Sequence, residues 1–262
     1  MQVTILGSGS STGVPGIGVG WGACDPNNPK NRRLRPSILI EEGDVKVLID
    51  TSPDLREQLL NSQIEHLDAV LFTHAHADHL HGIDDLRGIN RAMNAPLNIY
   101  ADSNTLKIID ERFPYTLVPL PEGANFFYKP TLVAHTLLPD QKYHIAGLNI
   151  HTFEQDHGFS KTMGFKIGDF GYTTDVVNLP SQAFDILKGV DTWLVGVFSD
   201  TPHATHVHVA KALEWREKIQ PKRCIMTHLG PQLDFQILQE SLPKGAEPAF
   251  DLMSFDIPHI IS

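Results

Sequence analysis

The segment 69–82 (AVLFTHAHADHLHG) constrains the fold most, because an apolar run predicted as a strand over 69–73 ends in a cluster of metal-ligand side chains. The candidate ligands are His74, His76, Asp78 and His79. The first two project together because alternate residues of an extended segment point the same way, and a tight turn lets the second pair face the same space from another direction. Two pairs of ligands fit two metal ions better than one, and imidazole with carboxylate suits zinc or manganese.

Three later segments each place one more candidate ligand directly after a predicted strand or hairpin. These residues are His157, Asp175 and His228. Each alone would be an ordinary polar residue at the end of a strand, but together they repeat one arrangement, a ligand at the edge of a sheet. A carboxylate at Asp175 is suited to bridging two cations that lie ~3.5–4 Å apart.

The hydrophobic pattern predicts a mixed sandwich. We predict strands over 3–6, 37–41, 45–49, 69–73, 97–100, 151–153, 191–198, 223–227 and 252–257, and a hairpin over 162–172 that turns at Gly168 and Asp169. Helices are predicted over 84–93, 103–113, 206–219 and 233–241, and one more with Ser52 as N-cap, Pro53 in the first helical position and Leu55, Leu59 and Leu60 as its apolar face.

Both halves begin with strands and continue with strands that alternate with helices. This order favours an α/β (α+β) sandwich over a doubly wound sheet. Because the sequence shows no linker and no low-complexity tract, we expect a single domain over residues 1–262.

The glycine-rich stretch 7–13 (GSGSSTG) follows the first predicted strand without matching a nucleotide-binding motif. A P-loop would end in Gly-Lys-Ser/Thr, and a dinucleotide fold needs a third glycine before a helix. A tight loop is the simpler interpretation, and a backbone-lined edge of an active site is the alternative. The basic run 30–35 (KNRRLR) is typical of solvated surface, with contact to a substrate as the alternative.

Charge and cysteine content limit the partners and the compartment. The formal net charge is -10, which disfavours tracking a long nucleic acid through non-specific attraction. The two cysteines, Cys24 and Cys224, do not form a disulfide framework, so we expect a reducing compartment. Without a signal-peptide pattern or an apolar run near ~18 residues, we expect a cytoplasmic protein with no membrane contact. A homodimer is compatible with the sequence.

These motifs resemble the metallo-β-lactamase superfamily, and they occur in that superfamily's order along the whole chain. The matching positions are Asp50, the His74-x-His76-x-Asp78-His79 segment, His157, Asp175 and His228. The resemblance implies a four-layer αββα sandwich with two metals at one edge and Asp50 orienting the site through hydrogen bonds. It also implies two groups of ligands joined by a bridging Asp175: His74, His76 and His157 for one metal, and Asp78, His79 and His228 for the other.

Within the superfamily the sequence is most similar to PhnP-like phosphodiesterases. The similarity lies in GSGSSTGVP, NPKNRRLRPS, HATHVHVAKALEW and MTHLGPQLDF, besides the histidine segment. It implies hydrolysis of small cyclic phosphodiesters, such as phosphoribosyl 1,2-cyclic phosphate, by a metal-bound hydroxide. The related tRNase Z carries a tRNA-gripping arm for which the short stretch between His157 and Asp175 has no room. PhnP-type proteins often hold a structural zinc on several cysteines before NPKNRR, where this sequence has only Cys24.

The resemblance also implies a histidine that contacts the scissile phosphate. The spacing to His228 favours His206, His203 remains the alternative, and His208 fits least. A protonated His206 would stabilise the phosphate or donate to the leaving oxygen, and Asp78 would accept a proton from the attacking water. Two other functions remain open: a thioester or lactone hydrolase with the same metals, and a non-catalytic accessory protein like PqqB of PQQ synthesis.

Overall fold

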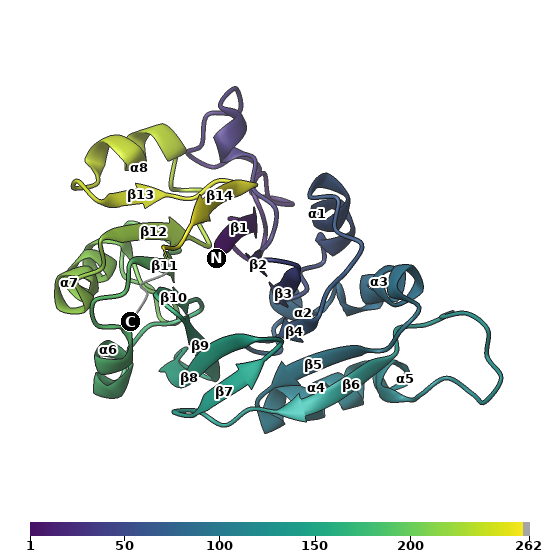
Figure 1. Cartoon of the computed structure of the whole chain (residues 1–262). Coiled ribbons are helices and arrows are strands. Elements are labelled where there is room, and N and C mark those ends of the chain that lie inside the picture. Colours follow the sequence, from purple (N-terminus) through teal and green to yellow (C-terminus); the bar gives the residue numbers. More distant parts are fainter. Residues whose placement is uncertain (259–262) are drawn as a thin grey trace.

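The computed structural model describes residues 1–258 and contains two seven-stranded sheets that pack face to face (Figure 1). The first sheet has the order β14-β1-β2-β3-β4-β5-β6, with β1 (Gln2–Gly7), β2 (Ser37–Glu42), β3 (Val45–Ile49), β4 (Ala69–Leu71), β5 (Leu97–Ala101), β6 (Leu132–Thr136) and β14 (Met253–Asp256). The second has the order β13-β12-β11-β10-β9-β8-β7, with β7 (Lys142–Ile145), β8 (Leu148–Asp156), β9 (Lys161–Ile167), β10 (Phe170–Thr173), β11 (Thr192–Gly196), β12 (Arg223–Thr227) and β13 (Ala246–Pro248).

Helices cover the outer face of each sheet, which confirms the predicted four-layer αββα sandwich. On the side of the first sheet lie α1 (Leu55–Asn61), α2 (Ala77–Leu80), α3 (Leu86–Met93), α4 (Ser103–Arg112) and α5 (Pro114–Leu117). On the side of the second lie α6 (Ser181–Leu187), α7 (Val209–Ile219) and α8 (Phe235–Ser241). Two short 3₁₀ turns, η1 (Pro29–Asn31) and η2 (Ile83–Asp85), complete the elements. The single-domain prediction extends to residues 259–262, which lie outside the described residues, and it stays a prediction.

The alternation of side chains along the strands explains the layers. In β2, Ile38 and Ile40 belong to the core between the two sheets, whereas Leu39 belongs to the core between the first sheet and its helices. In β3, Ile49 and Leu48 divide in the same way. Because successive strand residues point to opposite faces, a strand that is apolar at every position is buried on both faces.

Strand direction brings several strand ends to one edge of the sandwich. In the first sheet β3, β4, β5 and β6 run parallel, and in the second β10, β11, β12 and β13 do so. The carboxyl ends of parallel strands meet at a common edge. Asp50 follows β3, Asp175 follows β10, and His228 follows β12. The candidate ligands therefore come from both sheets.

The prediction for the first helix was wrong at its start. The helix α1 begins at Leu55 with Asp54 as the N-cap, two residues later than predicted. The Ser52 hydroxyl instead accepts a hydrogen bond from Asp54 N (3.2 Å) and donates one to Gln58 Oε1 (3.0 Å), so this buried serine ties the entry of the helix to its second turn. Leu60, predicted on the apolar face, is 61% exposed.

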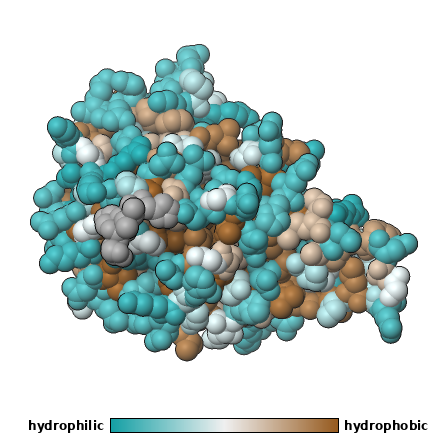
Figure 2. Space-filling model, viewed as in Figure 1, coloured by the Kyte–Doolittle hydropathy of each residue, from teal (hydrophilic) through white to brown (hydrophobic). Residues whose placement is uncertain are grey.

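Other boundaries differ by a few residues. The strand predicted over 69–73 ends at Leu71, and the helix predicted over 84–93 is split into η2 and α3. The hairpin turn at Gly168 and Asp169 is confirmed, since Phe170 pairs with Ile167 across it. Between α5 and β6 the chain leaves the body of the molecule, at the right of Figures 1 and 2, and exposes Phe126.

The glycine-rich stretch forms the tight loop expected after β1. A side chain at Gly7 would collide with the carbonyl of Arg35. Ser10 N donates to Leu229 O (3.2 Å), and Leu229 N donates to Ser8 O (2.8 Å), so the loop braces the residue after His228. Within the described part of the chain, the helices are all too short or too polar to cross a membrane.

Asp251 should be one of the polar anchors of this fold. Its carboxylate accepts from Ser8 N (2.8 Å), Ser8 Oγ (2.7 Å) and Leu34 N (2.7 Å). Replacement by alanine leaves buried donors without a partner, so we expect Asp251→Ala to lower the free energy of unfolding by about 2–4 kcal/mol. Burial raises the pKa of Asp251 to about 6, so urea unfolding should be compared at pH 8, where the carboxylate is ionised. Asp110→Ala, at an exposed position of α4, is the control, and equal stability of the two variants would contradict the prediction.

Candidate metal centre

The histidine segment turns from strand to helix within a few residues. His74 follows the end of β4, and His76 is the N-cap of α2 with extended dihedral angles of φ -66° and ψ 154°. Asp78 and His79 lie in the first turn of that helix. The change from extended to helical backbone separates the two pairs of side chains, as the sequence predicted, although a short helix rather than a simple turn produces the separation.

The structure brings the predicted ligands together in two clusters that share one residue. The first cluster contains His74, His76, His157 and Asp175, and the second contains Asp78, His79, Asp175 and His228. Within each cluster the ligand atoms lie within 4.8 Å of one another. All of these residues are buried except His76, which is exposed to solvent.

Asp175 joins the clusters because its two carboxylate oxygens face different ways. Its Oδ2 atom lies 3.4 Å from His157 Nε2 and 3.7 Å from His74 Nε2. Its Oδ1 atom lies 3.2 Å from His79 Nε2 and 3.1 Å from His228 Nε2. One oxygen thus faces each cluster, an arrangement suited to a carboxylate that bridges two metal ions.

Hydrogen bonds from the surroundings orient the imidazole rings. Asp50 Oδ2 accepts from His79 Nδ1 (2.6 Å), and Asp50 also accepts from the amide (2.8 Å) and the hydroxyl (2.7 Å) of Thr73. The Thr205 carbonyl accepts from His157 Nδ1 (2.8 Å). Because Nδ1 carries the proton in both rings, the Nε2 lone pairs point into the clusters.

Three buried ring atoms of the cluster histidines are unsatisfied: two Nε2 atoms that face the carboxylates, and His228 Nδ1, whose ring turns its Nε2 atom toward them. His74 Nε2 and His79 Nε2 are inaccessible to solvent and have no hydrogen-bond partner. A buried polar atom without a partner is costly. A cation in each cluster would satisfy both Nε2 atoms, and imidazole nitrogens with carboxylate oxygens are a donor set suited to zinc or manganese. The residues therefore fit the two divalent metals that the superfamily resemblance implies.

The charges of the site are strongly coupled. Burial alone would raise the pKa of Asp175, but His228 and His79 hold it well below its usual range. Burial would likewise lower the pKa of His79, but Asp175, Asp78 and Asp50 raise it well above the ordinary value. The ionised carboxylates thus favour positive charge at the centre, and protons on the imidazoles would compete with metal ions for it.

The backbone at the sheet edge is held in a conformation that non-glycine residues rarely adopt. Asp50, Asp175 and His228 have φ values of 65°, 48° and 57°. Left-handed residues of this kind cost of order 1–3 kcal/mol each and persist where the surrounding structure enforces them, often at functional sites. Three of them at one edge are independent support for a functional centre.

His206 lies next to both clusters, and His203 lies farther out. The His206 ring centroid is 4.8 Å from that of His157 and 5.1 Å from that of His228. The His203 ring is 5.3 Å from His206, and its Nδ1 accepts from Thr205 N (3.3 Å) on the exposed side. Burial lowers the pKa of His206 to about 3, so this histidine is neutral near pH 7 and donates through a single N–H. His208, the N-cap of α7, is not part of either cluster.

Two residues of the basic run, Arg33 and Arg35, contribute to structure, whereas Lys30 and Arg32 are exposed. The buried Arg33 guanidinium donates to the carbonyls of Leu233 (2.7 Å) and Gly230 (3.3 Å), and Arg35 forms an ion pair with Asp54 (2.6 Å). Cys24 Sγ lies 3.9 Å from Arg33 and is in neither metal cluster of the described residues. A structural zinc at this cysteine does not fit beside a buried guanidinium.

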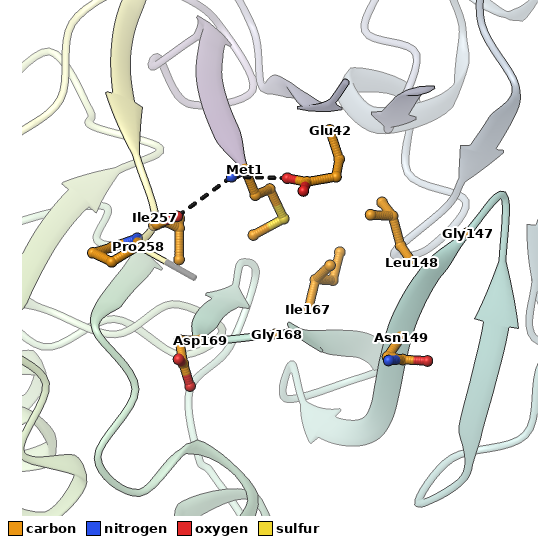
Figure 3. A pocket seen from close by; sticks show the side chains of 10 residues that line it. All are labelled: Met1, Glu42, Gly147, Leu148, Asn149, Ile167, Gly168, Asp169, Ile257 and Pro258. Carbon is orange, nitrogen blue, oxygen red and sulfur yellow. Dashed lines mark hydrogen bonds and ion pairs between the residues drawn. The ribbon is translucent and has the colours of Figure 1, made fainter. Parts of the chain in front are cut away.

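A separate cavity of about 520 Å³ lies at the opposite end of the sheets (Figure 3). It is lined by Met1, which precedes β1, and by the hairpin turn at Gly168 and Asp169, which precedes β10, whereas Asp175 follows β10. The Met1 ammonium forms an ion pair with Glu42 (2.8 Å) there. This cavity is therefore remote from the clustered ligands.

Sequence reasoning missed the residues that act through backbone or hydroxyl groups. Thr73 bonds Asp50, and its hydroxyl lies 3.0 Å from His74 Nδ1. Its place between a strand and the histidines was the only available indication. The Thr205 carbonyl left no trace in the sequence, because any residue supplies one.

The comparisons with known proteins agree with this centre. Residues 45–229 match the beta-lactamase superfamily domain. The chain belongs to the metallo-β-lactamase superfamily. Within it the chain is PhnP-like, because the crystal structure of a new diphosphatase from the PhnP family superposes with a TM-score of 0.89, at 30% identity over 98% of both chains.

Two curated relatives add to this comparison. An octanoyltransferase of Porphyromonas gingivalis is 32% identical over 96% of this chain and 50% of its own length. A ribonuclease Z of Bradyrhizobium sp. is 29% identical over 36% of this chain and 36% of its own. The chain thus spans half or less of the curated relatives it matches.

Asp50→Asn tests how the surroundings orient His79. The amide must keep its oxygen toward Thr73 N, so its NH₂ group faces His79 Nδ1 and shifts the ring proton to Nε2. We expect a ~10–100-fold loss of zinc affinity, measured by competition with a chromogenic chelator. Asp102→Asn, which preserves the N-cap of α4, should bind zinc as the unmodified protein does. Unchanged affinity of Asp50→Asn would contradict this role.

Proposed function

We propose that this protein is a dinuclear metal-dependent hydrolase of small phosphodiesters. The observation that carries the proposal is the Asp175 carboxylate, which offers one oxygen to each of two ligand clusters. The proposed ligands are His74, His76 and His157 for one divalent ion, Asp78, His79 and His228 for the other, and Asp175 for both. When bound, two zinc or manganese ions would lower the pKa of water and neutralise phosphate oxygens.

The chain's own residues have distinct roles in this proposal. The Nδ1 atom of His206 lies 3.9 Å from Asp175 Oδ2. A phosphate bound between the two clusters would therefore contact the His206 ring. Since burial keeps His206 neutral, it stabilises the phosphate by donating a hydrogen bond, rather than by the full positive charge expected from the sequence. Asp78 is placed between His79 and His228, at 3.4 Å from each Nε2 atom, and accepts a proton from the attacking water.

The substrate class rests on the relatives and on the shape of the site. The structural neighbour is described as a PhnP-family diphosphatase, and a curated relative is a ribonuclease Z, so both act on phosphate esters or anhydrides. Between His157 and Asp175 this chain has only the β9–β10 hairpin, with no arm to hold a long nucleic acid. We therefore propose small substrates, such as phosphoribosyl 1,2-cyclic phosphate. The cytoplasmic location and the homodimer stay predictions.

Acyl thioester hydrolysis is the second candidate. The match to a protein named octanoyltransferase over 96% of this chain favours it, and the same metal pair is able to polarise a carbonyl. The two clusters consist of imidazoles and carboxylates, a donor set for cations that neutralise a phosphate, so the phosphodiester proposal has the stronger support. A non-catalytic accessory role would require binding of metal without hydrolysis of any ester.

Activity after controlled metal loading separates these candidates. We expect protein reconstituted with two equivalents of zinc or manganese to hydrolyse bis-p-nitrophenyl phosphate and ribose cyclic phosphates. EDTA should abolish the activity, and either metal should restore it. Octanoyl-coenzyme A should be a poor substrate under the same conditions. Faster thioester than phosphodiester hydrolysis would contradict the proposal, and bound metal with neither activity would support the accessory role.

His206→Ala tests the residue proposed to contact the phosphate. We expect the variant to keep its two metals and to lose ~10²–10⁴ in kcat/KM, because a group that acts in the transition state is removed. Partial rescue by His206→Gln, which supplies a neutral donor, is expected if a hydrogen bond is the main contribution. His203→Ala should lose less, and His144→Ala, on the exposed strand β7, should lose nothing. Near-normal turnover of His206→Ala would contradict the proposed contact of His206 with the phosphate.

A further inference from the structure

Arg112 lies beside the histidine segment although it comes from a distant helix. It is the last residue of α4, and its Nη1 atom donates to the carbonyl of Ala75 at 3.1 Å. Ala75 separates His74 from His76, the exposed member of the first cluster. The guanidinium is therefore fixed at the rim of the proposed centre, on the side where His76 meets solvent.

His81 completes a small polar group at the same place. Its Nε2 atom lies 3.4 Å from Arg112 Nη1, and its ring packs edge-on against Phe113 at 5.4 Å. The aromatic contact and the end of α4 hold both side chains in position while leaving them exposed to solvent. Neither residue belongs to the ligand clusters.

The guanidinium has more hydrogen-bonding capacity than its contacts use. An arginine carries five N–H donors, whereas the described contacts engage a single nitrogen of Arg112. Over residues 1–258, no carboxylate lies within ion-pair distance of it, in contrast to Arg35 with Asp54 and Arg223 with Glu247. Holding the Ala75 carbonyl requires only one neutral donor, so the charge and the remaining donors are free to bind an anion.

We propose that Arg112, with His81 beside it, binds a second phosphate group of the substrate, a phosphomonoester that is separated from the scissile phosphodiester. This inference rests on the proposed function and names a specificity-determining residue for it. Guanidinium groups bind phosphate through paired hydrogen bonds, which makes the contact selective as well as attractive. In a chain with a net charge of -10, a cationic rim also favours the approach of a doubly phosphorylated anion.

The test compares two substrates that differ only in the second phosphate. These are ribose 1,2-cyclic phosphate with and without a phosphate on carbon 5, assayed with the metal-loaded full chain. For Arg112→Gln, which removes the positive charge, we expect KM for the phosphorylated substrate to rise ~10–100-fold with little change in kcat. KM for the other substrate should change by no more than about 2-fold, since its phosphodiester does not contact the arginine. Arg112→Lys should be intermediate.

Controls separate this role from a merely structural one. Arg56→Gln, at an exposed position of α1, should leave both substrates unaffected. Metal content of Arg112→Gln should equal that of the unmodified protein. Loss of metal, or an equal loss of activity on both substrates, would overturn the proposal and leave Arg112 as a support for Ala75.

Binding of stable product analogues makes the test independent of turnover. Calorimetry should show that the loaded protein binds ribose 1,5-bisphosphate more tightly than ribose 1-phosphate, and that Arg112→Gln removes the difference. If the protein shows this difference but hydrolyses no phosphodiester, the proposed function fails while the phosphate-binding role of Arg112 stands. If it hydrolyses phosphodiesters but binds both ribose phosphates equally, the role of Arg112 fails and the proposed function stands.

Discussion

The relative placement of the two sheets is tied to the contacts that the Asp175 carboxylate makes across them. It follows a strand of the second sheet, yet it faces His74 and His79, which follow a strand of the first. The two sheets must therefore pack in one fixed relation, and the apolar core between them, with Phe165 and Ile225 among its members, supplies that relation. The packing of the core thus fixes the geometry of the candidate metal centre at the edge of the sheets.

That constraint also places strain on the centre. Burial disfavours the ionised Asp175 carboxylate there, and His74 Nε2 and His79 Nε2 have no hydrogen-bond partner. The left-handed backbone at Asp50, Asp175 and His228 adds strain. A centre of this kind gains more from a bound cation than a relaxed one, because the ion satisfies the unpaired atoms and replaces protons on the ring nitrogens. Metal binding and folding are therefore expected to be linked.

The sequence predicted the parts of this structure that depend on local periodicity. The strand predicted over 37–41 and the turn at Gly168 are confirmed, and the candidate ligands at strand ends do converge, because parallel strands end at a common edge. Prediction from the sequence failed where a contact with a distant residue determines the local structure. Ser52 looked like a helix cap, but its hydroxyl bonds Gln58. Arg112 lies within the helix predicted over 103–113, and nothing in that pattern indicates that it bonds Ala75, 37 positions away. Such contacts follow from tertiary packing and leave no local pattern.

The basic run at residues 30–35 shows that a group of charged residues in a sequence does not by itself predict a charged binding site. Arg33 is buried against the carbonyls of Gly230 and Leu233, where it supports the loop that follows His228. Arg35 is neutralised by Asp54. Two of the four basic residues in this run are thus engaged within the protein, while Lys30 and Arg32 are exposed. A phosphorylated substrate of the proposed kind would find positive charge in bound metal ions and in isolated residues such as Arg112, which no run of like charges marks.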